Sequence, residues 1–358
     1  MSGWLSARRV LLVRLDNLGD VLMTTPAFAA VRDTLPHARL TLLTAPAAQA
    51  LAPHLPQLDA LITCNASWVK AGAAALEGQP RGQAEMALVE QLQAGRFDAA
   101  VIFTVSTQSA LPAALLCRMA GIPLVLAHAR ERAYGLLSDA VPETDAIEPG
   151  MRHEVRRQLD LVAQVGYRTP DERLRFRLRD EDRAAARELL LAAGADLSRP
   201  YVLMHPGATA PSRRYPPAAY GTAGVLLQQA GAQVLACGGP GDAAPLAELA
   251  TAGGIAALSP LRSLGQLAAL IDGARVLVAN NSGPVHLAAA LGTPVVDLYA
   301  LTNPQHTPWR VPSRVLNHDV PCRNCLQSVC AQGHHDCLRR VAPRQVAEAA
   351  LTLMREAA

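Results

Sequence analysis

The sequence predicts two α/β domains, each built on a doubly wound parallel sheet of the Rossmann-like type. The chain has 358 residues, more than one core of about 150 residues needs. Half of its residues are hydrophobic but only 4% are aromatic, which favours small-residue helices packed on aliphatic strands. Short aliphatic runs alternate with longer stretches of helical period in two successive blocks, as is typical of parallel sheets.

A polar stretch at 167–182 separates the two blocks. In the first block we expect helices at 26–34 and 86–94 and strands at 10–15, 40–44, 99–105 and 124–127. In the second block we expect a helix at 183–193 and strands at 201–205, 234–237, 275–279 and 295–299. The predicted domains are therefore 1–175 and 176–358, with a hinge near 170–182 that closes on a ligand. Because ligands bind beyond the carboxyl ends of parallel strands, we expect a cleft shared by the domains.

Charge and hydropathy exclude two broad classes of protein. The net charge is only +3 and no basic run carries interleaved aromatic residues, so nucleic acid is not an expected partner. Lys70 is the single lysine, so any phosphate-binding cation in the C-terminal half must be arginine or histidine. No run of about 18 uncharged apolar residues occurs, since Arg14, Asp16 and Asp20 interrupt the first apolar stretch. We therefore expect a cytoplasmic protein without a transmembrane segment.

The first candidate catalytic group follows the first expected strand, in the segment Arg14-Leu-Asp16-Asn-Leu-Gly19-Asp20. This segment lacks the Gly-x-Gly-x-x-Gly pattern of dinucleotide sites, which argues against a nicotinamide enzyme. Gly19 is expected at a tight turn, with Asp20 at the ligand-facing edge of the domain. There the Asp20 carboxylate can accept a proton from a bound hydroxyl group, or it can simply cap a helix. The spacing alone favours the helix cap.

Two segments of the second block have features of anion-binding sites. The segment 205–216 follows a strand and carries the hydroxyl groups of Thr209 and Ser212 and the charge of Arg213. An ordinary Pro/Gly loop explains this segment equally well. In the segment 280–294, Gly283 is expected to make a turn before an alanine-rich helix, whose first amide groups and Ser282 can bind an anion. His286, in the first helical turn, can donate a hydrogen bond to a diphosphate.

Three motifs, in order, resemble those of glycosyltransferase family 9, the heptosyltransferases, over nearly the whole chain. They are Arg14-x-Asp16-x-x-Gly19-Asp20-x-x-x-Thr24-Thr25-Pro26, the segment 205–216, and Ser282-Gly283-Pro284-x-His286-Leu287-Ala-Ala-Ala290. The resemblance implies a GT-B architecture, in which the N-terminal domain binds the acceptor and the C-terminal domain binds the nucleotide-sugar donor. It also implies that Asp20 is the general base. Asp16 is the alternative base, although it is more expected to support the turn.

The resemblance implies a set of substrate-binding residues as well. On the donor side these are Thr209, Ser212, Arg213, Asn281, Ser282, Gly283 and His286, with Arg214 as the alternative to Arg213. The family commonly has aspartate at the position of Asn281, so a different sugar nucleotide is an open alternative. On the acceptor side the candidates are Gly19, Lys70, Arg130 and Arg132.

The implied reaction is the inverting transfer of a heptose from ADP-heptose to a lipopolysaccharide core or related glycan. The acceptor is then lipid-linked or a glycan, and the enzyme works at the inner face of the cytoplasmic membrane. No Asp-x-Asp motif is placed to hold Mg²⁺, so no cofactor is expected, and Arg213, His286 and a helix dipole would stabilise the leaving diphosphate. Three alternatives stay open: a GT-B transferase for another nucleotide sugar, a sugar-nucleotide epimerase, and a nucleotide-sugar-binding protein without catalysis.

Four of the seven cysteines form a cluster, Cys322-x2-Cys325-x4-Cys330-x6-Cys337, with two histidines in the last gap. The first spacing suits a tetrahedral zinc site, but the second is looser than in usual zinc modules. Reduced or redox-labile thiols are therefore favoured over structural zinc. Outside this cluster, Arg152, His153 and Glu154 precede an expected helix. Contacts with the linker or with the acceptor are open alternatives for them, and solvated surface is the default assignment.

Overall fold

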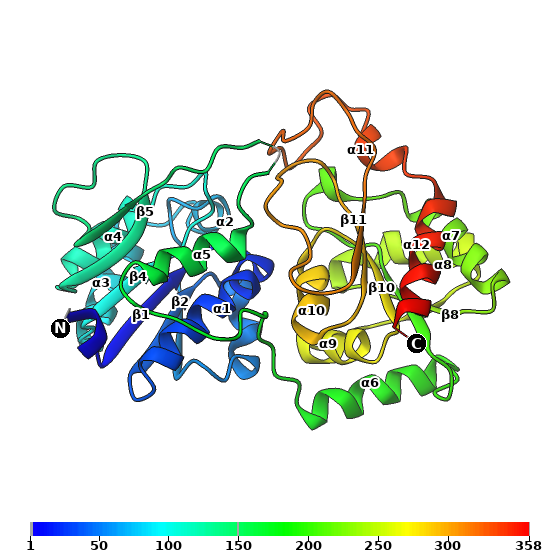
Figure 1. Ribbon diagram of the computed structural model, residues 1–358, viewed down its shortest axis with the longest axis horizontal. Helices are drawn as coiled ribbons and strands as arrows, with labels where there is room; N and C mark the ends of the chain where they lie inside the picture. Colours follow the sequence, from blue (N-terminus) through cyan, green and yellow to red (C-terminus); the bar gives the residue numbers. More distant parts are fainter. Residues whose placement is uncertain (1–2, 149, 358) are drawn as a thin grey trace. The chain divides into compact units, whose positions relative to one another are not determined.

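The computed structural model describes residues 3–148 and 150–357 and divides the chain into two compact units (Figure 1). Unit 1 comprises Met1–Ala146 and Arg152–Arg175, and unit 2 comprises Ile147–Met151 and Phe176–Ala358. Each unit contains one six-stranded parallel sheet, so the predicted fold class of two Rossmann-like α/β domains is confirmed.

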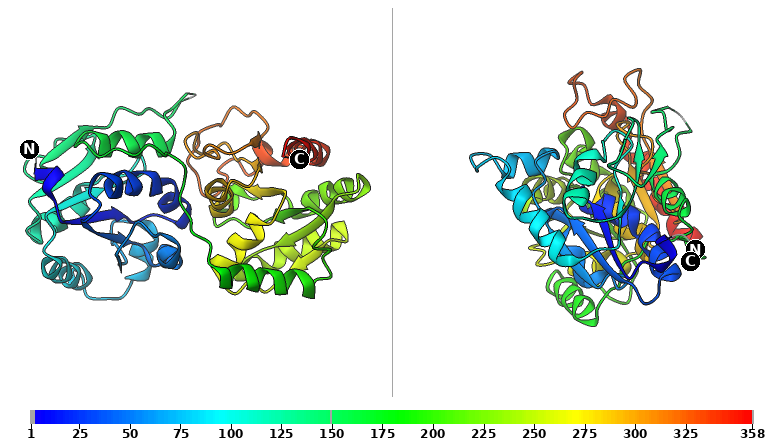
Figure 2. Two further views of the ribbon diagram at one scale, coloured as in Figure 1. Left: turned by 60° about the horizontal axis from the view of Figure 1, so that its bottom comes forward. Right: turned by 90° about the vertical axis from the view of Figure 1, so that its left-hand side faces the viewer.

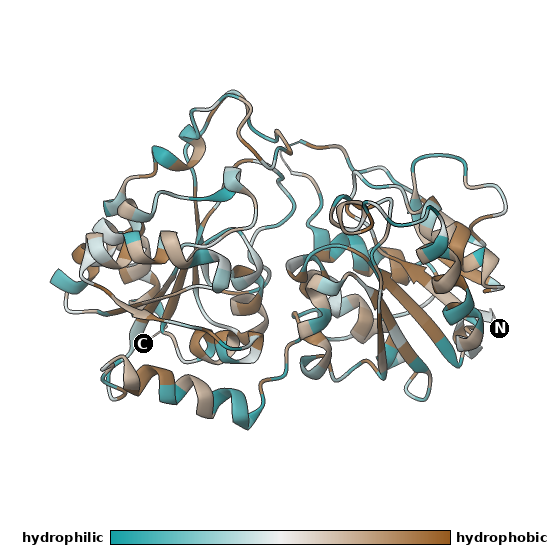
Figure 3. Cartoon of the chain, turned by 180° about the vertical axis from the view of Figure 1, so that it is seen from behind, coloured by the Kyte–Doolittle hydropathy of each residue, from teal (hydrophilic) through white to brown (hydrophobic). Residues whose placement is uncertain are grey.

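The sheet of unit 1 has the strand order β3-β2-β1-β4-β5-β6. Its strands are β1 (Arg9–Arg14), β2 (Arg39–Thr44), β3 (Ala60–Thr63), β4 (Ala99–Ile102), β5 (Leu124–Ala129) and β6 (Asp139–Pro142). The central strands are buried on both faces, which is why they read as unbroken aliphatic runs (Figure 3). Because β1 lies between β2 and β4, the strand order reverses at the β1/β4 pair, and parallel sheets of this kind bind ligands beyond that point.

Helices cover both faces of this sheet. They are α1 (Leu18–Thr34), α2 (Lys70–Ala75), α3 (Gln83–Gly95), α4 (Leu111–Met119) and α5 (Glu154–Ala163), with two 3₁₀ helices at Gly3–Ser6 and Pro46–His54. Helices α3 and α4 bury aliphatic side chains against β1, β4 and β5 in one hydrophobic cluster. Helices α1 and α5 lie side by side, and Phe28 of α1 packs edge-on against Phe103 at a centroid distance of 5.6 Å.

Unit 2 repeats the same topology, with the strand order β12-β11-β10-β7-β8-β9. Its strands are β7 (Tyr201–His205), β8 (Gln233–Cys237), β9 (Ala256–Leu258), β10 (Val276–Asn280), β11 (Val295–Leu298) and β12 (Ser313–Leu316). The strand order reverses at the β7/β10 pair, which is the counterpart of β1/β4. The loops after β7 and β10 therefore meet at one edge of the sheet.

The helices of unit 2 also form two layers. They are α6 (Asp180–Ala192), α7 (Pro217–Gln229), α8 (Ala243–Gly253), α9 (Leu264–Asp272), α10 (Gly283–Leu291), α11 (Asp336–Arg339) and α12 (Pro343–Glu356), with 3₁₀ turns at Pro211–Arg213 and Pro240–Asp242. Helices α7, α8 and α12 share one hydrophobic cluster with the strands. Helices α6 and α10 contact α9, and Figure 2 shows α6 and α12 on opposite sides of the sheet. Within the described residues, no helix is both long and apolar enough to span a bilayer.

The expected elements are confirmed apart from their ends, and the strands missing from the prediction share one property. They are β3, β6, β9 and β12, which are the four edge strands of the two sheets and are only partly buried. An edge strand needs no continuous aliphatic run, so its sequence carries a weak signal.

Helix α1 begins at Leu18, and the prediction that it starts at 26 was wrong. Pro26 lies inside the helix, where its missing N–H leaves the carbonyl of Leu22 without its usual partner. The hydroxyl of Thr25 donates to that carbonyl at 2.6 Å, which satisfies it and lets the helix continue. Gly19 consequently lies in the first turn of α1 and not in a tight turn before it.

Candidate active site

A buried arginine occupies the carboxyl end of β1 in unit 1. The side chain of Arg14 is fully buried, and three carboxylates surround its guanidinium. The nearest oxygens of Asp16, Glu154 and Asp20 lie 3.0, 3.0 and 3.6 Å from its nitrogens. Burial alone would lower the pKa of Arg14, but the negative charges of Asp16, Glu154 and Asp20 outweigh burial and raise it. Arg14 is therefore a permanent cation that holds three acids together.

Asp16 is the more enclosed of the two candidate bases. Only 9% of its side chain is exposed, and Gln108 Nε2 donates to it at 2.8 Å. Burial raises its pKa, against the lowering effect of Arg14. Asp16 also lines a pocket of about 290 Å³ at the β1/β4 reversal, whose other polar and aromatic lining residues are Trp68, Phe103, Thr104, Thr107, Gln108 and Ser109.

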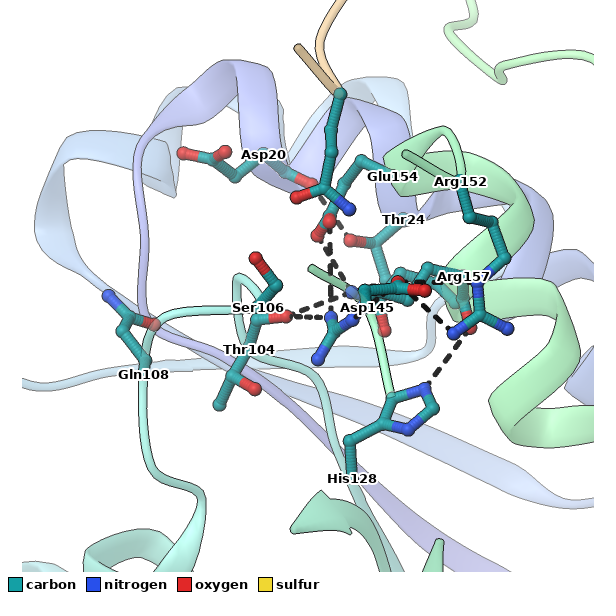
Figure 4. A network of polar contacts seen from close by, with 12 residues as sticks. Asp20, Thr24, Thr104, Ser106, Gln108, His128, Asp145, Arg152, Glu154 and Arg157 are labelled. Carbon is teal, nitrogen blue, oxygen red and sulfur yellow. Dashed lines mark hydrogen bonds and ion pairs between the residues drawn. The ribbon is translucent and has the colours of Figure 1, made fainter. Parts of the chain in front are cut away.

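Asp20 has the helix-cap role, which is one of the two roles between which the spacing of the sequence left a choice. It is the third residue of α1, and its Oδ2 accepts a hydrogen bond from the amide of Asn17 at 3.1 Å, so it does cap the helix. Its Oδ1 is the carboxylate oxygen 3.6 Å from Arg14, and 14% of its side chain is exposed. Figure 4 shows Asp20 at the border of the polar network. A cap of this kind fixes the carboxylate without removing its ability to accept a proton.

The start of α5 is not solvated surface, so the default assignment was wrong for Glu154, the first residue of this helix. Glu154 is fully buried, because the first turn of α5 lies against Arg14, and it also accepts a hydrogen bond from Gln158 at 2.7 Å. His153 caps α5 by accepting the amide of Val155 at 3.1 Å. Arg152 pairs with Asp145 and Asp160, so the network reaches the partly exposed rim of α5 (Figure 4).

The acceptor-side candidates differ in their surroundings. Lys70 is exposed at the first position of α2. Arg132 is exposed and stacks over Tyr134 at 5.3 Å from the ring centroid. The guanidinium of Arg130 donates to the carbonyl of Ser106 at 2.9 Å and so braces the loop after β4.

In unit 2, the loop after β7 is held by Asn280, the last residue of β10. Asn280 is fully buried; its Oδ1 accepts from the amide of Tyr215 at 2.9 Å, and its Nδ2 donates to the carbonyl of Pro206 at 2.7 Å. Gly207 contributes a second constraint, since a Cβ there would lie 2.2 Å from Asp242 Oδ2. The loop 206–215 is therefore rigidly attached at both ends to the edge of the sheet.

The side chains of this loop have separate roles. Arg213 is half-buried and, within the described part of the chain, its side chain makes no hydrogen bond or ion pair. Arg214 instead donates to the carbonyl of Ala208 at 2.8 Å. Thr209 is exposed. Ser212 was expected to offer a hydroxyl group to a phosphate, but this hydroxyl donates to the carbonyl of Gln327 at 2.7 Å.

The N-terminus of α10 is the second anion-binding feature of unit 2. Ser282 is its N-cap residue, but the Ser282 side chain does not cap the helix and donates to the carbonyl of Asn280 at 3.1 Å. Gly283, which was expected to form a turn, is the first helical residue. His286 is buried in the first turn. The first amides of the helix are therefore directed to the same sheet edge as loop 206–215.

Asn281 is held in place by Asp297 of β11. Its Nδ2 donates to Asp297 Oδ2 at 3.0 Å and to the carbonyl of His306 at 2.9 Å, and all three residues are buried. Burial raises the pKa of Asp297 to about 8, so this acid is mostly uncharged at neutral pH. No site role was expected for Glu154, Asn280 or Asp297 from the sequence. The only signals are a polar residue at the end of an aliphatic strand for Asn280 and a polar residue inside one for Asp297.

Within residues 3–148 and 150–357, no group of three or more histidine, cysteine or acidic side chains is arranged so that it could hold a metal ion. In the cysteine segment, Cys322 Sγ lies 3.8 Å from His334 Nε2. An Asp-x-Asp sequence does exist, at Asp180-Glu181-Asp182, but it forms the first turn of α6. There Asp182 Oδ2 accepts a hydrogen bond from the backbone amide of Arg179 at 3.1 Å, so this sequence is a helix cap.

The comparison with known proteins agrees with this geometry. The sequence model of glycosyltransferase family 9 (heptosyltransferase) matches residues 86–335. Lipopolysaccharide heptosyltransferase 1 of Pseudomonas aeruginosa is 28% identical, over 90% of this chain and 87% of its own length. Two solved structures share the fold at 21% identity. They are a family 9 glycosyltransferase of Veillonella parvula (TM-score 0.78, 98% of both chains) and an E. coli ADP-heptose lipopolysaccharide heptosyltransferase II (TM-score 0.72, 97% and 99%).

We predict that replacing Asn280 with leucine loosens loop 206–215 and destabilises unit 2. The substitution leaves the amide of Tyr215 and the carbonyl of Pro206 unpaired, at a cost of about 1–3 kcal/mol for each buried group. Chemical denaturation measures this loss, with Asn317→Ala at an exposed asparagine as the control. Equal stability of Asn280→Leu and Asn317→Ala would contradict the assignment.

Proposed function

This chain belongs to glycosyltransferase family 9, and we propose that it is an inverting heptosyltransferase that transfers a heptose from ADP-heptose to a lipopolysaccharide core or a related glycan. The observation that carries the proposal is that each unit has a polar site at the carboxyl edge of its sheet, and that the two sheets have the same strand order. Unit 1 presents carboxylates beyond β1, and unit 2 presents a cation and a helix N-terminus beyond β7 and β10.

The donor side of the proposal rests on unit 2. The leaving group of a nucleoside diphosphate sugar is a diphosphate, whose negative charge grows as the glycosidic bond breaks. Arg213, the amides at the start of α10 and His286 would stabilise that charge, with Thr209 as a further hydroxyl donor. ADP as the nucleotide is supported by the likeness to the E. coli enzyme, whose name states ADP-heptose. Because unit 2 itself supplies positive charge, we propose that the reaction needs no metal ion.

The acceptor side rests on unit 1. Asp20 would take the proton from an acceptor hydroxyl as its oxygen attacks the anomeric carbon. The bond from this carbon to the diphosphate oxygen breaks at the same time, and ADP leaves with the bonding pair. Attack opposite to the leaving group inverts the anomeric carbon. Asp20 is preferred to Asp16 because it is more exposed, whereas Asp16 is held by Arg14 and Gln108.

The acceptor itself would be a lipid-linked or free glycan bound at the pocket that Asp16 and Trp68 line. We further propose that the protein is cytoplasmic and meets a lipid-linked acceptor at the inner face of the membrane. The exposed Lys70 is the candidate for an acidic group of that acceptor. One alternative function keeps the fold and the chemistry: Asn281 replaces the aspartate common in the family, so a different sugar nucleotide is the second candidate donor.

Replacing Asp20 with asparagine should abolish most of the turnover and leave donor binding intact. The asparagine oxygen can still accept from the amide of Asn17, so the helix cap survives while the base is lost. We expect kcat to fall by about 10²–10⁴-fold, the usual contribution of a general base. The rate of sugar transfer from ADP-heptose gives kcat, and calorimetry gives the affinity for ADP in a separate measurement. A comparable loss of kcat in Asp16→Asn, with Asp20→Asn fully active, would assign the base to Asp16.

Replacing Arg213 with methionine should weaken binding of the nucleotide, whereas the neighbouring Arg214→Met should have little effect. A hydrogen-bonded charge pair with a diphosphate is worth about 10–100-fold in Kd, and Arg214 already bonds within its own loop. Calorimetry with ADP, UDP and GDP measures both variants and the wild-type protein. Preferential binding of UDP or GDP would exclude ADP-heptose as the donor. A loss of nucleotide affinity confined to Arg214→Met would assign the diphosphate contact to Arg214 and not to Arg213.

A further inference from the structure

Asn281 and Asp297 form a buried polar pair at the carboxyl edge of the unit 2 sheet. Asn281 directly follows β10 and precedes the N-cap residue of α10. Asp297 lies on the neighbouring strand β11, and its side chain is completely buried. Such a pair is costly to bury unless its hydrogen bonds are made, so its geometry is tightly restricted.

The orientation of the Asn281 amide follows from its partners. One hydrogen of Nδ2 goes to Asp297 Oδ2 at 3.0 Å and the other to the carbonyl of His306 at 2.9 Å. A backbone carbonyl can only accept, so the nitrogen must lie on this side of the amide. The backbone is fixed as well, because the amide of Asn281 donates to the carbonyl of Leu298 at 3.2 Å.

The amide oxygen must therefore lie on the other branch of the side chain. Within residues 3–148 and 150–357, Oδ1 of Asn281 accepts no hydrogen bond, and it is not among the fully buried polar atoms that lack a partner. An acceptor that keeps some exposure beside an open helix N-terminus is suited to a ligand that carries a hydrogen-bond donor.

We propose that Asp297 is a positioning residue that locks the Asn281 amide with its oxygen toward the donor substrate. The site then selects a ligand with an N–H or O–H group at this point, either a hydroxyl of the transferred sugar or the amino group of the nucleobase. This inference rests on the proposed function, since it assumes that unit 2 binds a nucleotide sugar. Asp297 is suited to the role because as an uncharged acid it accepts from Asn281 without placing a second negative charge near the diphosphate.

The variants Asp297→Asn and Asp297→Ala distinguish a positioning role of Asp297 from a purely structural role. Asp297→Asn is uncharged, has nearly the same shape and keeps an oxygen for Asn281, so we expect donor KM and kcat close to those of the wild-type protein. Asp297→Ala removes this acceptor and releases one side of the amide. We expect its donor KM to rise about tenfold, the effect of one hydrogen bond, with kcat little changed. Thermal unfolding establishes that both variants fold.

A variant of Asn281, the residue that donates these hydrogen bonds, tests the same arrangement. Asn281→Asp replaces the donating nitrogen by an oxygen that can no longer donate to the carbonyl of His306, so it should raise donor KM even though an oxygen remains for the ligand. ADP binding by calorimetry separates the two sources of the recognised group. A loss of ADP affinity in Asp297→Ala assigns the contact to the nucleotide, and an effect confined to the KM of ADP-heptose assigns it to the sugar.

The outcomes distinguish this inference from the proposed function. A wild-type protein that binds no nucleotide and transfers no sugar would overturn both. An active wild-type protein with wild-type KM in Asp297→Ala and Asn281→Asp would overturn only the positioning role. Equal losses of kcat and affinity in Asp297→Asn and Asp297→Ala would also overturn it, because the asparagine should rescue a hydrogen bond but not a general structural defect.

Discussion

The buried guanidinium of Arg14 is the constraint on which the candidate catalytic edge of unit 1 depends. A buried cation is tolerated only when acids pair with it, and here Asp16, Asp20 and Glu154 come from the end of β1, the start of α1 and the start of α5. These three elements must therefore meet at one point. Three acids around one cation leave an excess of negative charge there, and a basic oxygen is required to accept a proton from an acceptor hydroxyl.

Unit 2 organises the equivalent edge with uncharged groups. The amides of Asn280 and Asn281 brace the loops after β7 and β10, and Asp297 is mostly uncharged at neutral pH because burial raises its pKa to about 8. Arg213 and the start of α10 are then the main sources of charge at this edge. A carboxylate in their place would oppose a diphosphate, so the choice of amides for the structural bonds preserves a positive potential.

The two sheets share one strand order, and the difference between their sites comes from the residues that end the strands and from the loops and helices that follow them. In both sheets the strand order reverses between the first and the fourth strand of the unit, and this reversal opens a crevice at the carboxyl edge. The fold thus decides where a ligand binds, and the residues that end β1, β7 and β10 decide which chemistry is possible. In unit 1 these residues supply acids, and in unit 2 they supply hydrogen-bond donors and a cation.

The sequence by itself determined the fold class, the buried central strands and the segments that carry Asp20, Arg213 and Ser282, because aliphatic periodicity and small-residue turns are local signals. Only the tertiary structure decided the partners of these residues. Glu154 reaches Arg14 across 140 positions of sequence, and Asn281 meets Asp297 through the pairing of β10 with β11. Such contacts depend on how helices and strands pack, and a polar residue in a linear sequence gives no indication of which distant group will satisfy it.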